Sequence, residues 1–181
     1  MFAFVRQLRA DFSGHRPTLD PLLTAAQVLL YILLAGVILA IAMTVLGLVT
    51  TVATHGAELL RPPSHDTWKP VSSLLLGLAA LGMIFGAVVA VLAIIRSVGD
   101  GNAFTVGNAV RLEKVAGDVL GIQILDLLGR WIDVPVGGDI NGFDIGASLS
   151  PGGIAIVLLL FILARVFRQG AAMRDDLEGT V

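Results

Sequence analysis

The sequence predicts an all-α integral membrane protein, a four-helix bundle, from two observations. First, residues 27–51 carry no charged side chain. At about 1.5 Å per residue, a helix over this run crosses the roughly 30 Å hydrocarbon core of a bilayer. Second, 56% of the residues are hydrophobic and 14% are charged, whereas a soluble domain carries about 25% charged residues. The lipid bilayer is therefore the first partner that the sequence predicts.

The composition also argues against several function classes. The chain has no cysteine, which excludes disulfides, thiol catalysis and thiolate metal sites. Its formal net charge of −2 is too small to predict direct nucleic acid binding. The three histidines (His15, His55, His65) lie in separate polar stretches. We therefore expect no metal site and no cofactor.

The N-terminal segment predicts a short amphipathic helix on the membrane surface. Its apolar residues recur every three or four positions, with Arg6 and Arg9 between them (Phe2, Val5, Leu8, Phe12). A frayed terminus is the alternative. The first spanning helix follows at about residues 25–52. Because its apolar run is much longer than the roughly 7–15 residues of a signal-peptide core, we interpret it as an uncleaved anchor.

The second spanning helix is expected at about residues 71–95, after a polar loop in which Pro62 and Pro63 prevent helix formation. Gly82, Gly86 and Ala90 follow at four-residue spacing. Such a ridge of small residues lets two helix backbones approach closely. The ridge therefore predicts packing against another helix. We favour one of the same chain, and a homo-oligomer stays open.

The third helix, at about residues 106–132, begins after Thr105, a suitable N-cap. Its apolar stretch contains Asp118, Gln123 and Asp126. An Asp near the centre of a membrane helix costs about 3 kcal/mol, and each Leu, Ile or Val returns only about 0.5 kcal/mol. This helix therefore needs the other helices to insert, or it lies in the membrane interface.

Two interpretations of these intramembrane polar residues compete. Carboxylates inside a membrane often mark a cation or proton path, which makes a small translocator the alternative function. In the structural interpretation, Asp118 lies near one membrane boundary and Asp126 pairs with Arg130 one turn later. We favour the structural interpretation. The translocator stays open because no basic residue of the other helices is placed deep enough to reach Asp126.

The remaining segments are an outer loop, a fourth helix and a tail. The loop, about residues 132–151, is rich in Asp and Gly and is compatible with a small hairpin. The last helix is expected at about 152–169, and residues 170–181 form a hydrophilic cytoplasmic tail. The whole chain is thus expected to be one membrane domain.

The distribution of basic residues predicts the orientation. Nine of the 12 lie in segments that four crossings place on one side (Arg6, Arg9, Arg16, Arg96, Arg111, Lys114, Arg165, Arg168, Arg174), and three lie on the other (Arg61, Lys69, Arg130). Loops rich in Lys and Arg stay in the cytoplasm. We therefore expect four crossings of a bacterial inner membrane with both termini inside.

Two stretches on the expected cytoplasmic side carry motifs. Residues 101–105 read GNAFT and are followed by Asn108 and by Arg111-Leu112. Residues 167–170 read FRQG, followed by Met173-Arg174-Asp175 and a closing EGTV. Together they resemble the GNPFT…N…RL and FRxGxxLRxD…EGTV elements of a family of small four-helix bacterial membrane proteins of unknown function, the YoaS-like group. The resemblance covers about residues 70–181. This chain has Ala103 where the family has Pro and Gly107 where it has Glu, which weakens the expected cap at Thr105.

The resemblance implies a four-helix inner-membrane protein and a cytoplasmic regulator as partner, and it implies no catalytic residues. The chain has no metalloprotease, serine hydrolase or nucleotide-binding motif either, so we expect no enzyme. The expected function is that of a regulatory or partner-binding membrane module. Its predicted binding face consists of Asn102, Phe104, Thr105, Asn108, Arg111, Phe167, Arg168, Gly170 and Arg174. A structural latch between Phe104 and Phe167 is the more modest interpretation, with Arg168 and Arg174 facing Asp100, Asp175 or headgroups.

Overall fold

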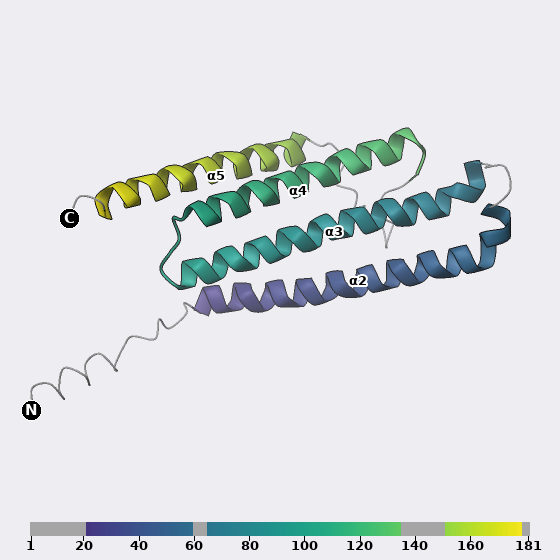
Figure 1. Ribbon diagram of the computed structural model, residues 1–181, viewed down its shortest axis with the longest axis horizontal. Helices are drawn as coiled ribbons and strands as arrows, with labels where there is room; N and C mark the ends of the chain where they lie inside the picture. Colours follow the sequence, from purple (N-terminus) through teal and green to yellow (C-terminus); the bar gives the residue numbers. More distant parts are fainter. Residues whose placement is uncertain (1–20, 60–64, 135–150, 179–181) are drawn as a thin grey trace, which may run out of the picture.

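The computed structural model describes residues 21–59, 65–134 and 151–178. These residues form four helices and no strand (Figure 1): α2 (Pro21–Leu59), α3 (His65–Gly99), α4 (Val106–Trp131) and α5 (Pro151–Glu178). The predicted all-α fold class is confirmed. The expected N-terminal surface helix and most of the Asp/Gly-rich loop with its hairpin lie outside the described residues.

Three of the helices are long and apolar enough to cross a membrane. These segments are Pro21–Gly56 of α2, Trp68–Gly99 of α3 and Pro151–Arg174 of α5, with mean hydropathies of 2.8, 2.8 and 2.0. The chain is accordingly a membrane protein. Helix α4 is not among the three, because charged and amide side chains interrupt its apolar residues.

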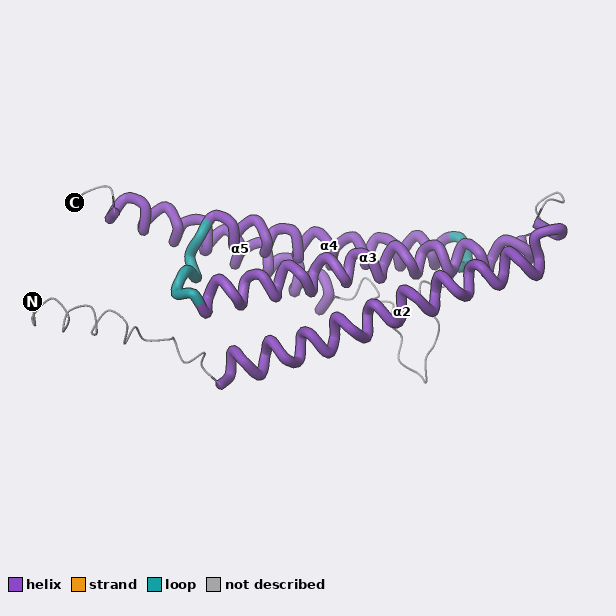
Figure 2. Tube along the Cα trace, turned by 60° about the horizontal axis from the view of Figure 1, so that its bottom comes forward, coloured by secondary structure: helices purple, strands orange, loops and turns teal. Residues whose placement is uncertain are grey.

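The helices pack only against their neighbours in sequence. Among the described residues, α2 contacts α3, α3 contacts α4 and α4 contacts α5, and no other pair of helices meets. Figures 1 and 2 show the result, an antiparallel row with α2 and α5 at its two edges. The polar helix α4 is thus covered by α3 on one side and α5 on the other. Along α2, Val37 is the one buried residue among those whose side chains are described.

The helices extend beyond the apolar runs that locate them in the sequence. Helix α3 begins at His65 and contains Pro70, and α5 continues through the expected tail to Glu178. An apolar run indicates which part of a helix can cross a bilayer. It does not set the ends of the helix, because backbone hydrogen bonds can continue into polar segments outside the membrane. The end of α5 also carries the good helix formers Ala171, Ala172 and Met173 and no proline.

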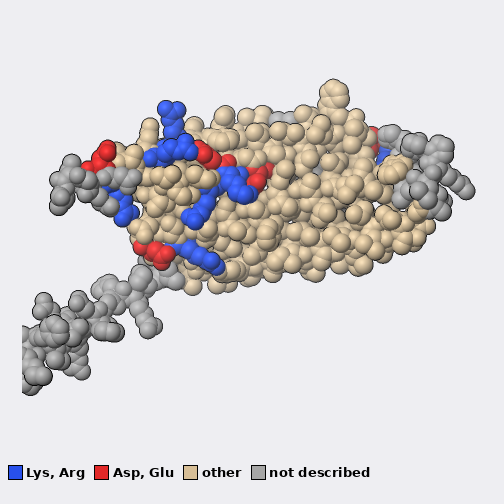
Figure 3. All heavy atoms as spheres, in the orientation of Figure 1, with Lys and Arg blue, Asp and Glu red and all other residues tan. Residues whose placement is uncertain are grey.

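Charged side chains gather at one end of the row. In the face shown in Figure 3, the Lys, Arg, Asp and Glu side chains cluster near the end where α3 and α5 terminate, and the middle of this face is uncharged. This distribution is that of a membrane protein whose charged end lies in the headgroup region or beyond.

Candidate functional site

The turn between α3 and α4 is built around Gly101, which has a φ of 78°. The Gly101 N–H donates to the Val98 carbonyl at 3.0 Å, and the Asn102 N–H donates to the Ser97 carbonyl at 2.9 Å. These two bonds form a Schellman motif, in which the left-handed residue is most often glycine because a Cβ is disfavoured there. The first residue of the GNAFT motif therefore ends α3.

Thr105 begins α4 as its N-cap. Its backbone is extended, with φ −129° and ψ 150°, and its hydroxyl accepts from the Asn108 N–H at 3.2 Å. This bond satisfies one of the free amide groups at the start of the helix. The cap is therefore formed although Gly107 replaces the Glu of the resembled family.

Asn108 ties the two helices together from a completely buried position. Its side-chain nitrogen lies 2.9 Å from the Ala103 carbonyl, 3.2 Å from the Asn102 carbonyl and 3.0 Å from the Ser97 hydroxyl. Its side-chain oxygen accepts from Arg111 Nη1 at 2.7 Å. One amide thus satisfies polar groups of both the α3–α4 turn and the first turns of α4.

The second motif stretch meets this turn from α5. The rings of Phe104 and Phe167 lie 5.0 Å apart with an interplanar angle of 43°, a favourable geometry for an aromatic pair. A Cβ at Gly170 would lie 2.7 Å from Phe104 Cδ1, so the glycine makes room for the ring. Arg174 Nη1 donates to Asn102 Oδ1 at 3.1 Å. The expected contact between Phe104 and Phe167 is confirmed.

We call this cluster the motif latch and define it by eight residues: Asn102, Phe104, Thr105, Asn108, Arg111, Phe167, Gly170 and Arg174. Arg168 lies outside it. Its guanidinium pairs with Glu113 of α4, which was not among the partners expected for Arg168. The sequence gives no signal for this pair, which depends on the rotation of α4 and α5 about their axes.

The two aspartates of α4 are paired on their own helix. Lys114 Nζ lies 2.6 Å from Asp118 Oδ2, and Arg130 Nε lies 3.0 Å from Asp126 Oδ2. Asp126 is buried, at 5% exposure. Both pairs have the i,i+4 spacing that places side chains on one helix face. The Asp126–Arg130 pair is as predicted, and the same rule also indicates the Lys114–Asp118 pair.

Gln123 is the other buried polar residue of α4 beside Asn108 and Asp126. Its exposure is 0%, and neither its Oε1 nor its Nε2 has a hydrogen-bond partner. It packs against α5, where a Cβ at Gly153 would lie 2.8 Å from Gln123 Oε1. The structure therefore does not bring Gln123, Asp118 and Asp126 together into one polar site.

Part of the predicted ridge of small residues lies at a contact between helices. A Cβ at Gly86 would lie 2.6 Å from Lys114 Nζ and 3.2 Å from Asp118 Oδ2, so α3 and α4 approach closely there. A Cβ at Gly82 would meet nothing within 4 Å. Ala90 is buried. The close approach that Gly86 permits is thus made within the chain.

Two further contacts were not predicted from the sequence. At the end of the row remote from the motif latch, Lys69 Nζ lies 2.6 Å from Asp133 Oδ2 and connects α3 to the end of α4. Near the motif latch, Arg96 hydrogen-bonds to the Tyr31 hydroxyl, which connects α3 to α2. In the described part of the chain, no group of three His, Asp or Glu side chains lies close enough to hold a metal ion.

The comparison with protein families agrees with this architecture. The family described as "Protein of unknown function (DUF2975)" matches residues 57–181. The chain belongs to this family. The DUF2975 match covers α3, α4, α5 and the whole motif latch, whereas most of α2 precedes it. Membership in a family of unknown function is therefore confirmed, and the YoaS-like label stays a prediction. No curated protein and no solved structure shows significant similarity to the chain.

Proposed function

We propose that this DUF2975 protein is a non-enzymatic partner-binding module of the bacterial inner membrane, with four crossings, both termini in the cytoplasm and a cytoplasmic regulator protein as its partner. The observation that carries the proposal is the motif latch. Two stretches about 60 residues apart in sequence form one surface at the charged end of the row. The excess of Lys and Arg in the segments at this end favours a cytoplasmic location.

The motif latch leaves apolar side chains exposed beside its internal contacts. Phe104 is 47% exposed, and Val106 and Val110, one turn apart on α4, are 54% and 53% exposed. Met173 of α5 is 63% exposed. Apolar and aromatic residues at a polar end of a membrane protein are typical of a surface that contacts another protein. The internal contacts hold this surface in one shape, which favours binding because little freedom is lost.

Site-specific cross-linking tests the proposal. A photoreactive residue at position 106 or 173 of the full chain, expressed in its native membrane, should cross-link to one specific protein. The same residue at position 159 is the control, since Leu159 lies in the apolar part of α5 and is 63% exposed. Phe104→Ala should abolish the cross-link from position 106. Trp131→Ala, which removes an 82% exposed aromatic ring at the other end of α4, should retain it.

Two outcomes would reject a partner at this surface. One is the absence of any protein cross-link from positions 106 and 173 in membranes where the chain is correctly inserted. The other is an equal yield of the same product from position 159.

The alternative function, a cation or proton translocator, gains no support from the geometry of α4. Asp118 and Asp126 each have a cation on their own helix. Their positions, eight residues apart, lie about 12 Å apart along the helix axis. Unchanged ion flux in liposomes containing Asp126→Asn would be consistent with the structural role of this carboxylate.

A further inference from the structure

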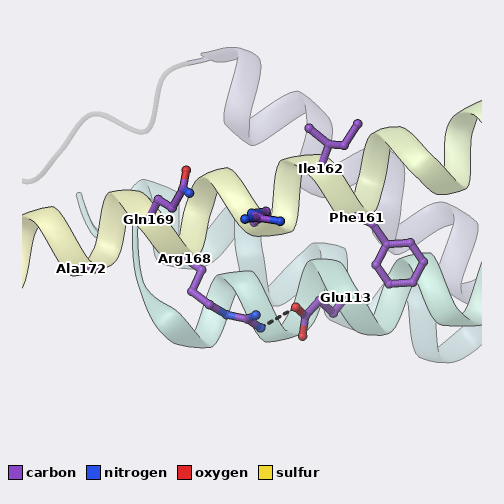
Figure 4. Close-up of a pocket in the computed structure, with 7 residues that line it drawn as sticks. Glu113, Phe161, Ile162, Arg168, Gln169 and Ala172 are labelled. Carbon is purple, nitrogen blue, oxygen red and sulfur yellow. Dashed lines mark hydrogen bonds and ion pairs between the residues drawn. The ribbon is translucent and has the colours of Figure 1, made fainter.

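An open groove of about 600 Å³ lies on the exposed face of α5, beside Arg165 and Arg168. Glu113 of α4 contributes to it, and its other main lining residues lie within three turns of α5 (Phe161, Ile162, Arg165, Arg168, Gln169). Figure 4 shows Arg168 reaching from α5 to Glu113, with Ile162 and Gln169 on the opposite side of the α5 ribbon. The groove is separate from the residues of the motif latch.

The groove is amphipathic along the helix axis. Its two large apolar residues, Phe161 and Ile162, are 41% and 61% exposed and belong to the apolar segment of α5. Arg165 is the first charged residue after that segment, and Arg168 and Gln169 follow within about one turn. Where a membrane-crossing helix changes from apolar to basic, it meets the phospholipid headgroups. The groove therefore lies at the boundary between acyl chains and headgroups.

The charges of the groove favour a single negative charge in its occupant. Arg168 is neutralised by Glu113, and this pair holds both side chains in place. Arg165 is exposed and makes no hydrogen bond or ion pair within the described residues. Two arginines and one glutamate leave one uncompensated positive charge. A guanidinium binds a phosphate through two parallel hydrogen bonds, and the Gln169 amide beside it can donate another.

We propose that this groove is a binding site for a phospholipid whose headgroup carries one net negative charge. The phosphodiester lies on Arg165 and Gln169, and an acyl chain lies along Phe161 and Ile162. The apolar half of the groove argues for a lipid rather than a free phosphate ion, which would leave these two side chains without a partner. The site does not depend on the partner protein proposed above, since Arg165 is not part of the motif latch.

Native mass spectrometry of the purified full-length protein in mild detergent tests this site. The protein is titrated with phosphatidylglycerol or with phosphatidylcholine of the same acyl chains, and the fraction with one bound lipid is measured. Phosphatidylglycerol should be retained in preference to phosphatidylcholine. Because one basic residue near a membrane surface is worth about 1 kcal/mol, Arg165→Gln should weaken phosphatidylglycerol binding about fivefold.

Three further variants sharpen the test. Gln169→Glu adds a negative charge to the groove at nearly constant shape and should weaken binding as Arg165→Gln does. Arg165→Lys keeps the charge and should bind more tightly than Arg165→Gln. Arg96→Gln removes a charge from the same end of the row but outside the groove, and should bind like the unchanged protein. A single elution peak in size-exclusion chromatography confirms that each variant is folded.

The proposal is overturned if Arg165→Gln retains the lipid as well as the unchanged protein does. It is also overturned if Arg96→Gln loses as much binding, which would indicate general charge attraction, or if phosphatidylcholine binds equally. Displacement of phosphatidylglycerol by millimolar inorganic phosphate would identify a site for a free anion instead. Loss of lipid with an intact protein cross-link from position 106 would separate this site from the proposed partner surface.

Discussion

Replacing Gln123 with Met should stabilise the protein. The Gln123 side chain is completely buried, and neither of its polar atoms has a hydrogen-bond partner. The folded state therefore bears the cost of removing an amide from polar surroundings without the compensation of a new bond. Met has a similar length and shape, is flexible and lacks the amide, so it can fill the same volume between α4 and α5.

The size of the effect follows from the two unpaired atoms. A buried polar group without a partner costs about 1–3 kcal/mol. In a membrane protein we expect a stabilisation near the lower end of this range, since measured side-chain hydrogen bonds in membranes average about 0.6 kcal/mol. We therefore expect Gln123→Met to raise the free energy of unfolding by about 1 kcal/mol. Because Gln123 packs closely against Gly153, a branched residue at position 123 should give a lower free energy of unfolding than Met does.

Titration from a mild detergent into SDS measures this difference. Far-UV circular dichroism follows the loss of helix during the titration, and the emission of the two tryptophans, Trp68 of α3 and Trp131 of α4, is recorded in parallel. Ile124→Met is the matched control. It introduces the same side chain at the next position, which is 48% exposed, and should leave the midpoint unchanged.

A lower midpoint for Gln123→Met, with Ile124→Met unchanged, would refute the reasoning. It would mean that the Gln123 amide is hydrogen-bonded in the folded protein and contributes to stability. In that case Gly153→Ala should be destabilising as well, because its Cβ would displace the amide.

Three more predictions use the same SDS titration. Asn108→Ala should lower the free energy of unfolding by about 1–3 kcal/mol, because it leaves buried polar groups unpaired; an unchanged midpoint would show that water replaces the amide. Gly170→Val should cost at least the roughly 0.5–1.5 kcal/mol of an aromatic pair, since its Cβ displaces Phe104, and a smaller loss would show that the ring moves freely. Gly86→Val should cost less than about 1 kcal/mol, since its Cβ meets the flexible end of Lys114; a larger cost would show that the Lys114 ammonium cannot move aside.

Much of the fold could be predicted from the sequence because membrane crossing leaves a strong local signal. The apolar runs locate α2, α3 and α5, and the polar residues of α4 indicate that it needs covering by other helices, as the contacts with α3 and α5 show. The pairing of Phe104 with Phe167 could also be predicted from the sequence. The predicted topology places both motif stretches at the same end of the molecule, so their aromatic residues have few other neighbours.

The contacts between helices could not be predicted because they depend on rotation and axial register. Arg168 meets Glu113, and Gln123 meets Gly153, only at one particular rotation of α4 against α5. A helix such as α2, which is apolar on all sides, carries no pattern that would select the face turned to its neighbour.

The absence of a distinct packing face on the apolar helices also helps to explain why the helices form a row. In water, a bundle closes because each helix buries an apolar face, whereas in lipid an exposed Leu or Ile costs nothing. The edge helices α2 and α5 can therefore remain without a second neighbour. The two inner helices of the row are α3 and α4. Only α4, with its amide and carboxylate side chains, has a physical reason to be covered on both sides, whereas α3 is apolar and lies between its two neighbours in sequence. The polar side chains of α4 thus account for its own inner position in the row.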